Sequence, residues 1–316
     1  MASPRSIRIG ISQCLLGDPV RYDGGHKRND FLADVLDQHV EWVPVCPEVE
    51  AGFGVPREAM QLVGSARHPR LMTIATKQDK TNALVQFSVR RVQELESLDL
   101  SGYVFKARSP SCGTQAVPLY DRDGGFTRSA VGLFARAFME QFPLMPIEEE
   151  DRLLDENHRA HFLERVYGYR RWREFLRSPV TKQRLVQFHA THKYLLMAHS
   201  LVHAQRLGSL VARAHRSRPA DLARRYGVEL MDTMRIRTSL PKHANVLQHL
   251  LGYFKKRLTR NERATILRVI DDFRTGHVPL AVPLTAIEDL TQRFELSYLC
   301  EQVYFEPYPR QLMTQP

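Results

Sequence analysis

The chain has 316 residues, of which 43% are hydrophobic and 25% are charged, and its formal net charge at neutral pH is +10. This composition is sufficient for two buried cores and excludes a disordered or low-complexity chain. The N-terminal residues include no apolar run long enough for a signal peptide and no segment approaches a membrane span, so we expect a soluble cytoplasmic protein without a membrane partner.

Residues 1–146 alternate between strand-like and helix-like segments. The helix-like segments are residues 29–39 (NDFLADVLDQH) and 80–98, where apolar residues recur at helical spacing. The strand-like segments are SIRIGIS (6–12), EWVPVC (41–46), LMTIAT (71–76) and SGYVFKA (101–107). This alternation predicts an α/β N-terminal domain with a mostly parallel sheet and flanking helices.

Residues 147–316 read as helical almost throughout. The segment IEEEDRLL (147–154) places acidic residues in what we expect to be a first helical turn. Ser178-Pro179 is typical of an N-cap followed by proline, and Thr259 with Glu262 has the spacing of a capping box. A last helix is expected from about residue 285. We therefore predict an all-α C-terminal domain, 147–316, after a domain spanning 1–146.

Positive charge is concentrated in the second half. Residues 1–146 carry 17 Lys and Arg against 16 Asp and Glu, whereas residues 147–316 carry 28 against 19. Ten of the 13 histidines also lie in the second half. This distribution suggests that the helical half binds a polyanion, with a merely solvated basic surface as the alternative.

The chain has four cysteines, far apart and without a CxxC pair, which excludes a disulfide framework. Cys14, Cys46 and Cys112 each follow a strand-like segment, so the carboxyl ends of parallel strands can bring them to one crevice. Three thiolates suggest a metal: zinc with His26 as a fourth ligand, or an iron–sulfur cluster with one open iron. From spacing alone, three unrelated cysteines remain an alternative.

Ionisable and hydroxyl side chains accompany the three cysteines, which favours a functional site over chance. They lie within a few residues of the three cysteine turns or in the loops beside them: Asp23, Lys27, Glu48, Arg57, Lys106, Ser109 and Ser111.

Longer segments resemble known families. SQCLLGDPVRYDGGHK (12–27), VPVCPEVEAGFGVPRE (43–58) and FKARSPSCG (105–113) resemble the three signature segments of the thiouracil desulfidase family. In the second half, FHATHKYLLMAH, HANVLQHLLGYFKKRLTRNE and VPLAVPLT resemble the YbgA-like domain. The combination is similar to bacterial fusion enzymes that remove sulfur from 4-thiouridine in tRNA.

This resemblance implies a [4Fe-4S] cluster held by Cys14, Cys46 and Cys112, with one open iron. It further implies a non-redox hydrolysis that converts 4-thiouridine in tRNA to uridine and releases hydrosulfide. Cys300 matches no ligand position of the family, and its apolar helical context predicts a packing role.

Roles for the accompanying residues follow from the chemistry. Glu48 is the expected general base, with a helix cap or a salt bridge as its alternative role. Ser109 is preferred over Ser111 as its partner because neighbours in an extended segment point to opposite faces. The remaining expectations are charge stabilisation by Lys106, orientation of the pyrimidine edge by Asp23 and Lys27, and substrate binding by Lys27, Arg57 and Ser111.

Two helices of the second half are candidates for binding RNA. The helix after Ser178 places Lys182, His189, His192, Lys193, His199 and His203 within about a third of its circumference, with at least one histidine expected to be buried. A second helix places Lys242, Asn245, His249, Tyr253 and Lys256 on one side. The RNA-binding candidates are Lys182, His189, His192, Lys193, His249, Tyr253 and Lys256.

The expected partner is tRNA, with no obligate protein partner. One alternative is a desulfidase of free thiouracil or thionucleotides, in which the helical domain serves assembly. Another is an iron–sulfur sensor that binds nucleic acid. Glu48 and Ser109 favour catalysis over sensing.

Overall fold

The computed structural model describes residues 7–121, 123–213 and 218–313. Contacts between residues divide the chain into two compact units, with the division between Phe162 and Leu163. None of the helices in the described ranges is long and apolar enough to cross a membrane.

The first unit contains eight strands and the helices among them, within the described residues. Its strands are β1 (Ile7–Ser12), β2 (Val40–Val45), β3 (Met60–Gly64), β4 (Pro69–Thr73), β5 (Gly102–Phe105), β6 (Val117–Tyr120), β7 (Phe126–Ala130) and β8 (Ile147–Glu149). Its helices are η1 (Gln13–Leu16), η2 (Phe31–Val35), η3 (Leu36–His39), α1 (Pro47–Glu50), α2 (Thr81–Glu96), α3 (Leu133–Gln141) and η4 (Arg152–Leu154). The expected helix over residues 29–39 forms as a π-helical turn, η2, followed by the 3-10 helix η3.

A fully parallel sheet forms the centre of this unit, with the strand order β2-β1-β5-β8. Every residue of β5 is buried, as expected for a strand covered on both faces. Gly10 of β1 is required by the close approach of Tyr103 on β5, because a Cβ at Gly10 would lie 2.1 Å from the Tyr103 ring. The α/β prediction for this half is confirmed.

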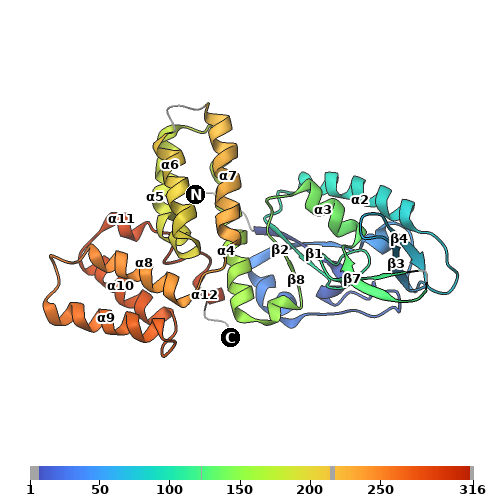
Figure 1. Ribbon diagram of the computed structural model, residues 1–316, viewed down its shortest axis with the longest axis horizontal. Coiled ribbons are helices and arrows are strands. Elements are labelled where there is room, and N and C mark those ends of the chain that lie inside the picture. Colours follow the sequence, from blue (N-terminus) through green and yellow to red (C-terminus); the bar gives the residue numbers. More distant parts are fainter. Residues whose placement is uncertain (1–6, 122, 214–217, 314–316) are drawn as a thin grey trace. The chain divides into compact units, whose positions relative to one another are not determined.

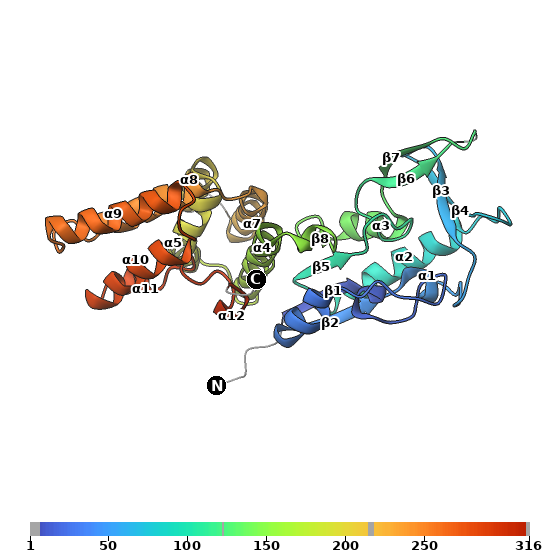
Figure 2. The same ribbon diagram turned by 90° about the horizontal axis from the view of Figure 1, so that it is seen from below.

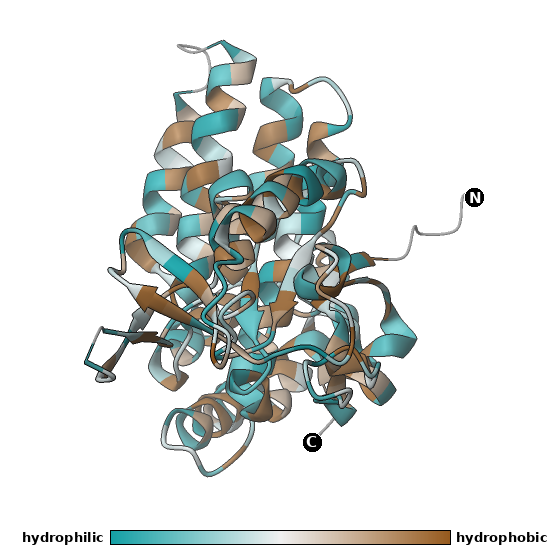
Figure 3. Cartoon of the chain, turned by 90° about the vertical axis from the view of Figure 1, so that its right-hand side faces the viewer, coloured by the Kyte–Doolittle hydropathy of each residue, from teal (hydrophilic) through white to brown (hydrophobic). Residues whose placement is uncertain are grey.

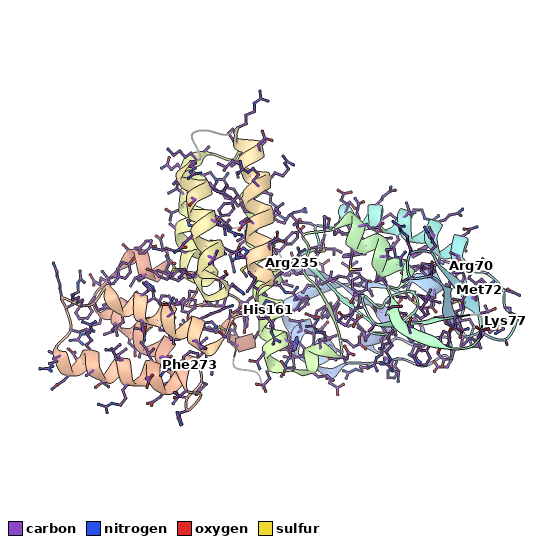
Figure 4. All side chains as sticks on the ribbon, viewed as in Figure 1. Arg70, Met72, Lys77, His161, Arg235 and Phe273 are labelled. Atoms are coloured by element: carbon purple, nitrogen blue, oxygen red, sulfur yellow. The ribbon has the colours of Figure 1, made fainter. Side chains whose placement is uncertain are left out.

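A second sheet, of order β4-β3-β6-β7, was not predicted. Three of its strands had no sequence assignment, and the expected strand LMTIAT contributes to it as β4, antiparallel to β3. Figure 2 shows β3, β4, β6 and β7 grouped apart from β1, β2 and β5. Arg70 and Met72 lie on β4, and Lys77 lies in the turn after it (Figure 4). A salt bridge of 2.6 Å between Arg70 and Asp79 links the two ends of that turn.

The helices α2 and α3 lie side by side in the first unit (Figure 1). The core between α3 and β5 is aromatic: the rings of Tyr103 and Phe105 stack at 4.1 Å, and Phe138 lies 4.7 Å from Tyr103 and 5.4 Å from Phe105. Because these rings are fully buried, they fix the position of α3 against the strand that leads to Cys112.

The prediction of a helix over residues 147–154 is wrong for its first residues. Ile147–Glu149 is strand β8, which pairs in parallel with Tyr103–Phe105 of β5. The predicted domain boundary after residue 146 therefore precedes the division between the compact units, because β8 adds a fourth strand to the first sheet. This segment is a strand because it pairs with a strand that is distant in the sequence. Its acidic composition does not indicate that pairing.

The second unit is helical, which confirms the all-α prediction for the C-terminal region. Its helices are α4 (Glu156–Leu176, which begins before the division), α5 (Lys182–His199), α6 (Leu201–Ala212), α7 (Pro219–Arg235), α8 (Leu240–Gly252), α9 (Arg260–Arg274), α10 (Ala281–Arg293), α11 (Ser297–Cys300) and α12 (Arg310–Met313). Hydrophobic and hydrophilic positions alternate along these helices (Figure 3), which is the pattern of helices with one buried face.

Helix boundaries in this unit test the capping predictions. The capping box of Thr259 and Glu262 is confirmed at the start of α9. The predicted cap at Ser178 is wrong, because Thr181 is the N-cap of α5 and accepts a hydrogen bond from the Arg184 backbone. The last long helix begins at Ala281, earlier than expected, because a proline in a first turn needs no N–H donor.

Cys300 ends α11 and is exposed, so its predicted packing role is wrong. Its neighbour Leu299 is the residue of α11 that is buried.

Candidate functional site

A cavity of about 780 Å³ lies at the carboxyl ends of β1, β2 and β5. Cys14 follows β1 in η1, Cys46 directly follows β2, and Cys112 lies in the loop after β5. All three side chains line this cavity. The three strands are parallel neighbours, so their ends share one edge of the sheet, and the expected convergence of the cysteines occurs.

The first turn of α3 holds the loop that carries Cys112. The backbone N–H groups of Phe134 and Ala135 both donate to the carbonyl oxygen of Ser111, at 3.0 and 3.1 Å. Gly132, directly before α3, approaches this loop so closely that a Cβ there would lie 2.5 Å from the same oxygen. The loop is therefore fixed by otherwise unpaired N–H groups of a helix start.

The other two cysteines are also held through their backbones. Cys46 is the N-cap of α1, and its N–H donates to Glu50 Oε1 at 2.9 Å. The Cys46 thiol donates to the carbonyl of Val20 at 3.7 Å. The carbonyl of Cys14 accepts the N–H of Lys27 at 2.9 Å, which folds the loop over residues 21–27 back onto η1.

Burial makes all three thiols poor acids. It raises the pKa of Cys14 to about 12 and raises the pKa of Cys46 and Cys112 above the ordinary thiol value. Negative charge on Cys46 adds to the rise in pKa at both Cys14 and Cys112, so the thiols are close enough to oppose one another's ionisation. Thiolates here need a cationic group bound through sulfur, as a metal centre would be.

The donor set fits an iron–sulfur group. Three sulfur side chains surround a cavity of sufficient size, whereas His26, the candidate fourth zinc ligand, is exposed and does not line it. Among the described residues, no three His, Cys, Asp or Glu side chains are arranged to hold a metal ion.

Glu48 faces the cysteines from the first turn of α1. Its Oε2 accepts a hydrogen bond from Arg57 Nε at 2.8 Å and lies 2.6 Å from Arg57 Nη2. Its Oε1 accepts from Ser111 Oγ at 2.7 Å. Arg57 also donates to the carbonyls of Val20 and Gly54, so the guanidinium is fixed on several sides. The structure thus shows the salt bridge that was one role considered for Glu48, on a carboxylate that also lines the cavity.

Ser111, and not Ser109, contacts both Glu48 and a cysteine. Ser111 Oγ lies 3.6 Å from Cys112 Sγ, while Ser109 Oγ lies 2.9 Å from Ser111 Oγ and accepts the Cys112 N–H at 3.2 Å. The reason given for preferring Ser109 is wrong, because residues 107–112 form turns and no extended strand, with Arg108 at a φ of 59°. Ser109 reaches Glu48 through Ser111.

Lys106 lines the cavity and forms an ion pair with Glu150. The Lys106 ammonium also donates to the carbonyl of Ala107 at 3.0 Å, and Glu150 Oε2 accepts the Ala107 N–H at 2.5 Å. Sequence reasoning missed Glu150 because residues 147–154 were assigned to a helix. No local motif marks it, since only the pairing of β8 with β5 brings it to the cavity.

Asp23 and Lys27 have different surroundings. Lys27 lines the cavity, whereas Asp23 is exposed and does not. Asp23 accepts the N–H of Gly25 at 3.0 Å, which lowers the pKa of its carboxyl, and lies 3.4 Å from Arg21 Nε. Arg21 itself lines the cavity, so Asp23 reaches the cavity through its ion pair with Arg21, and its expected role in orienting the pyrimidine stays a prediction.

Residues 9–150, which contain all three cavity cysteines and Glu48, match the family described as 2-thiouracil desulfurase. The resemblance of the three cysteine segments is thereby confirmed. Residues 193–309 match a family described as a protein of unknown function, DUF1722.

Two curated relatives each match part of the chain. The uncharacterized protein YbgA of Escherichia coli (strain K12) is 28% identical over 147 residues, covering 46% of this chain and 87% of YbgA, which confirms the YbgA-like resemblance. The uncharacterized protein YbbK of Bacillus subtilis (strain 168) is 28% identical over 111 residues, covering 34% of this chain and 73% of YbbK. A solved structure described as the [4Fe-4S]-dependent thiouracil desulfidase TudS is 26% identical, with a TM-score of 0.40, and covers 47% of this chain and 94% of that chain.

Beyond residues 9–150, most of the RNA-binding candidates are exposed. The exposed side chains among them are Lys182 and Lys193 on α5, His249 on α8, and Tyr253 and Lys256 in the turns that follow α8. The expectation that Tyr253 and Lys256 continue the α8 face is wrong, because α8 ends at Gly252. His203 likewise lies on α6, because Ser200 separates α5 from α6.

Two histidines of the expected basic face are buried. His192 is 5% exposed and its Nδ1 lies 2.7 Å from the Phe188 carbonyl, while His199 is fully buried, with Nδ1 2.7 Å from the Ile236 carbonyl. Burial lowers the pKa of His192 to about 3 and that of His199 to about 4, so both rings are neutral near pH 7. The prediction of His192 as a surface RNA contact is therefore wrong.

Three other candidates do gather. His189, Lys193 and His249 line one hollow of about 310 Å³ together with Tyr194 and Gln205. His189 is half-buried, its Nδ1 lies 3.1 Å from the Tyr226 hydroxyl, and burial lowers its pKa to about 4. This hollow therefore offers the Lys193 ammonium beside two histidines and apolar groups.

Proposed function

We propose that this protein is an iron–sulfur-dependent desulfidase that converts 4-thiouridine in tRNA to uridine and releases hydrosulfide. The observation that carries the chemistry is the single cavity in which three thiols face the Glu48 carboxylate, inside a 2-thiouracil desulfurase domain. Cys14, Cys46 and Cys112 would hold the cluster. When bound, such a cluster supplies an open iron, a Lewis acid that holds sulfur and makes the thiocarbonyl carbon more electrophilic.

Glu48 is placed to take the proton of the attacking water. Arg57 fixes Oε2, and Ser111 donates to Oε1. The carboxylate is therefore held with Oε1 toward Ser111 and the cysteines. A water oxygen bonds to the carbon as one water proton passes to Glu48, and Glu48 returns that proton to sulfur. The carbon–sulfur bond then breaks with both electrons leaving on sulfur as hydrosulfide, and the remaining hydroxyl proton passes to Glu48 as the carbonyl forms. The products are a carbonyl and hydrosulfide, and no electron donor is required.

Ser109 and Ser111 form a hydroxyl pair beside this carboxylate. Their oxygens are 2.9 Å apart, and Ser111 is the member that reaches Glu48. This pair can move a proton between Glu48 and the departing sulfur without a large displacement. The Lys106 ammonium, held by Glu150, also lines the cavity and would stabilise negative charge that develops on the ring or the sulfide.

The choice of tRNA as substrate rests on the charge of the helical half. Residues 147–316 hold 28 Lys and Arg against 19 Asp and Glu, and Lys182, Lys193 and Lys256 are exposed. A stacked 4-thiouridine must be gripped through its phosphates and exposed before it can enter a buried cavity. A basic helical region attached to the desulfurase domain can supply this grip.

The test is anaerobic incubation of the iron-loaded protein with thiolated bulk tRNA, followed by nucleoside analysis. We expect 4-thiouridine to disappear as uridine and hydrosulfide appear in equal amounts. Loss of 4-thiouridine without hydrosulfide, or no loss at all, would contradict the proposal.

A second candidate is a desulfidase of free thiouracil or thionucleotides. The family match favours it, because the matched family is described by the free base. Parallel assays with 2-thiouracil and 4-thiouridine monophosphate decide between them. Turnover of the small molecules together with failure on tRNA would favour this candidate.

A further inference from the structure

A groove of about 1010 Å³ runs between α6 and α7. The residues that line the groove from α6 recur every three or four positions, so they lie on one face of that helix. The lining residues of α7 follow a similar spacing. The groove is lined from the α6 side by Val202, Gln205, Arg206, Ser209, Leu210 and Arg213, and from α7 by Leu222, Arg224, Arg225, Val228 and Glu229. The two faces therefore form opposite walls.

Four arginines and one carboxylate give this groove its charge. Arg206, Arg213, Arg224 and Arg225 are all exposed. The nearest ion pair is weak, since Arg224 and Asp221 are 3.9 Å apart and both exposed. Within the part of the chain that the structure describes, the other three arginines form no ion pair. Their guanidinium groups are available to an outside anion.

The floor of the groove is partly apolar. Val202 is 56% exposed and Val228 is 41% exposed, which is unusual for two valines that flank the same hollow. Guanidinium forks bind phosphate oxygens in a bidentate manner, and apolar side chains between them can contact sugars. A strand with regularly spaced phosphates and sugars matches this pattern better than an acidic peptide, whose carboxylates are borne on side chains of varied reach.

We propose that the groove between α6 and α7 binds the sugar–phosphate backbone of tRNA. The proposal rests on the proposed function, and it assigns the main grip to a surface different from the α5 and α8 candidates. Arg206, Arg213 and Arg225 each neutralise one phosphate. The hollow at Lys193 is then a secondary contact.

The experiment compares two triple variants of the full chain. R206A/R213A/R225A removes three groove charges, and R260A/R263A/R268A removes the same number from α9. Binding of labelled tRNA is followed by fluorescence anisotropy at several salt concentrations. We expect the groove variant to bind at least about 10-fold more weakly near 0.1 M salt, with a salt slope lower by about two to three. The α9 variant should remain within about threefold of the wild type.

Each outcome bears on a distinct claim. Equal losses in the two variants, or no loss in the groove variant, overturn the groove while leaving tRNA binding by the wild type intact. A wild type that desulfurates thiouracil but does not bind tRNA overturns the tRNA substrate and the groove together. A groove variant that still binds tRNA but no longer binds an acidic protein also overturns the proposal. Thermal unfolding of each variant checks that the helices are intact.

Two buried carboxylates carry a second, independent inference. Glu149 and Glu150, which are 5% and 8% exposed, lie at the end of β8 beside the end of β5. Glu150 binds Lys106 and the Ala107 N–H, where the Cys112 loop begins. Glu149 Oε1 accepts the N–H groups of Thr114 and Gln115, at 2.7 and 3.4 Å, where that loop ends.

Consecutive residues at a strand end point to opposite sides, so neighbouring carboxylates reach the two limbs of one loop. We infer that Glu149 and Glu150 are positioning residues that hold the Cys112 loop at both ends. They act on the thiol through the backbone of residues 106–107 and 114–115, and they need not touch the substrate.

Thiol accessibility tests this inference without depending on activity. The full chain, purified without added iron, is treated with iodoacetamide, and Cys112 labelling is followed by peptide mass spectrometry. We expect E149A and E150A to label at least about 10-fold faster than wild type, since Cys112 is only 4% exposed when the loop is held. E149Q, which keeps an acceptor oxygen, should restore most of the protection.

The matched control is D121N, because Asp121 accepts the N–H groups of Asp123 and Gly125 in the turn between β6 and β7. D121N should leave Cys112 labelling unchanged. Rates within about twofold of wild type in E149A and E150A would overturn the inference, as would an equal rise in D121N. Iron content after anaerobic reconstitution gives a second measurement, and we expect it to fall in E149A and recover in E149Q.

Discussion

Three cysteine side chains share one cavity, and each should be required for iron. Replacing Cys14, Cys46 or Cys112 by Ala removes one of three sulfur donors, so we expect iron to fall from about four atoms per chain to less than about one, with loss of the brown colour. Cys300→Ala is the matched control, because Cys300 is exposed on α11. Iron analysis and visible absorption of anaerobic protein make the measurement. Stoichiometric zinc without iron would contradict the iron–sulfur assignment.

The Glu48 carboxylate should affect turnover without affecting iron. Glu48→Gln keeps the shape of the side chain but removes the base, so we expect turnover to fall at least about 10²-fold. Ser111→Ala should cost more than Ser109→Ala, because Ser111 donates directly to Glu48 at 2.7 Å. Glu94→Gln, an exposed change on α2, controls for loss of one carboxylate. Near-normal turnover in Glu48→Gln would remove this residue from the mechanism.

Among the elements, α3 determines the position of the Cys112 loop. A Cβ at Gly132 would lie 2.5 Å from the Ser111 carbonyl oxygen, so Gly132→Ala must shift the loop or the helix start. We expect a loss of about 1–3 kcal/mol in the free energy of unfolding and reduced iron loading. Gly252→Ala, where a Cβ meets nothing within 4 Å, should change neither. Thermal unfolding and iron analysis test both, and normal loading in Gly132→Ala would contradict the role of α3.

The helix α5 carries a buried neutral histidine, which predicts acid sensitivity. The pKa of His192 is about 3 in the folded chain, against an ordinary value of about 6.5. As the pH falls, the histidine is therefore protonated in the unfolded chain before it is protonated in the folded chain. The contribution of His192 is complete above about pH 6.5 and is lost as pH falls toward 3, at up to about 1.4 kcal/mol per pH unit.

Urea unfolding at pH 7.5, 6 and 5 tests this element. In His192→Gln the free energy of unfolding should decline less steeply as the pH falls, because glutamine does not titrate. The difference in slope should correspond to about one proton. His277→Gln, an exposed change, should decline in parallel with the wild type. If His192→Gln also declines in parallel, His192 is not the source of the acid sensitivity.

For the whole molecule, salt should separate the two activities. Raising salt from about 50 to 200 mM should slow desulfuration of dilute tRNA by at least about 10-fold, because phosphate contacts release counterions. Turnover of uncharged 2-thiouracil should change by less than about twofold, since that substrate needs no phosphate contact. Hydrosulfide release measured with both substrates makes the test. Equal sensitivity of the two reactions would show that salt acts on the cavity and not on RNA binding.

The sequence by itself determined the features that depend on local pattern. The alternation of strands and helices in the first half, the helical second half and the capping box at Thr259 all appear as expected. The cysteines converge because carboxyl ends of neighbouring parallel strands necessarily lie at one edge. Residue types near those strand ends were sufficient to identify Glu48, Lys106 and Arg57 as cavity residues.

Only the tertiary structure decided which of these residues meet. Ser111 reaches Glu48 because the loop turns at Arg108, which an extended segment would not do. Glu150 reaches Lys106 because β8 pairs with β5, although about 40 residues separate them. His192 is buried because α5 packs inside the helical unit, whereas a histidine at helical spacing looks the same on a buried face and on an exposed one. Pairing and burial are properties of contacts distant in the chain, and no local pattern of residues contains them.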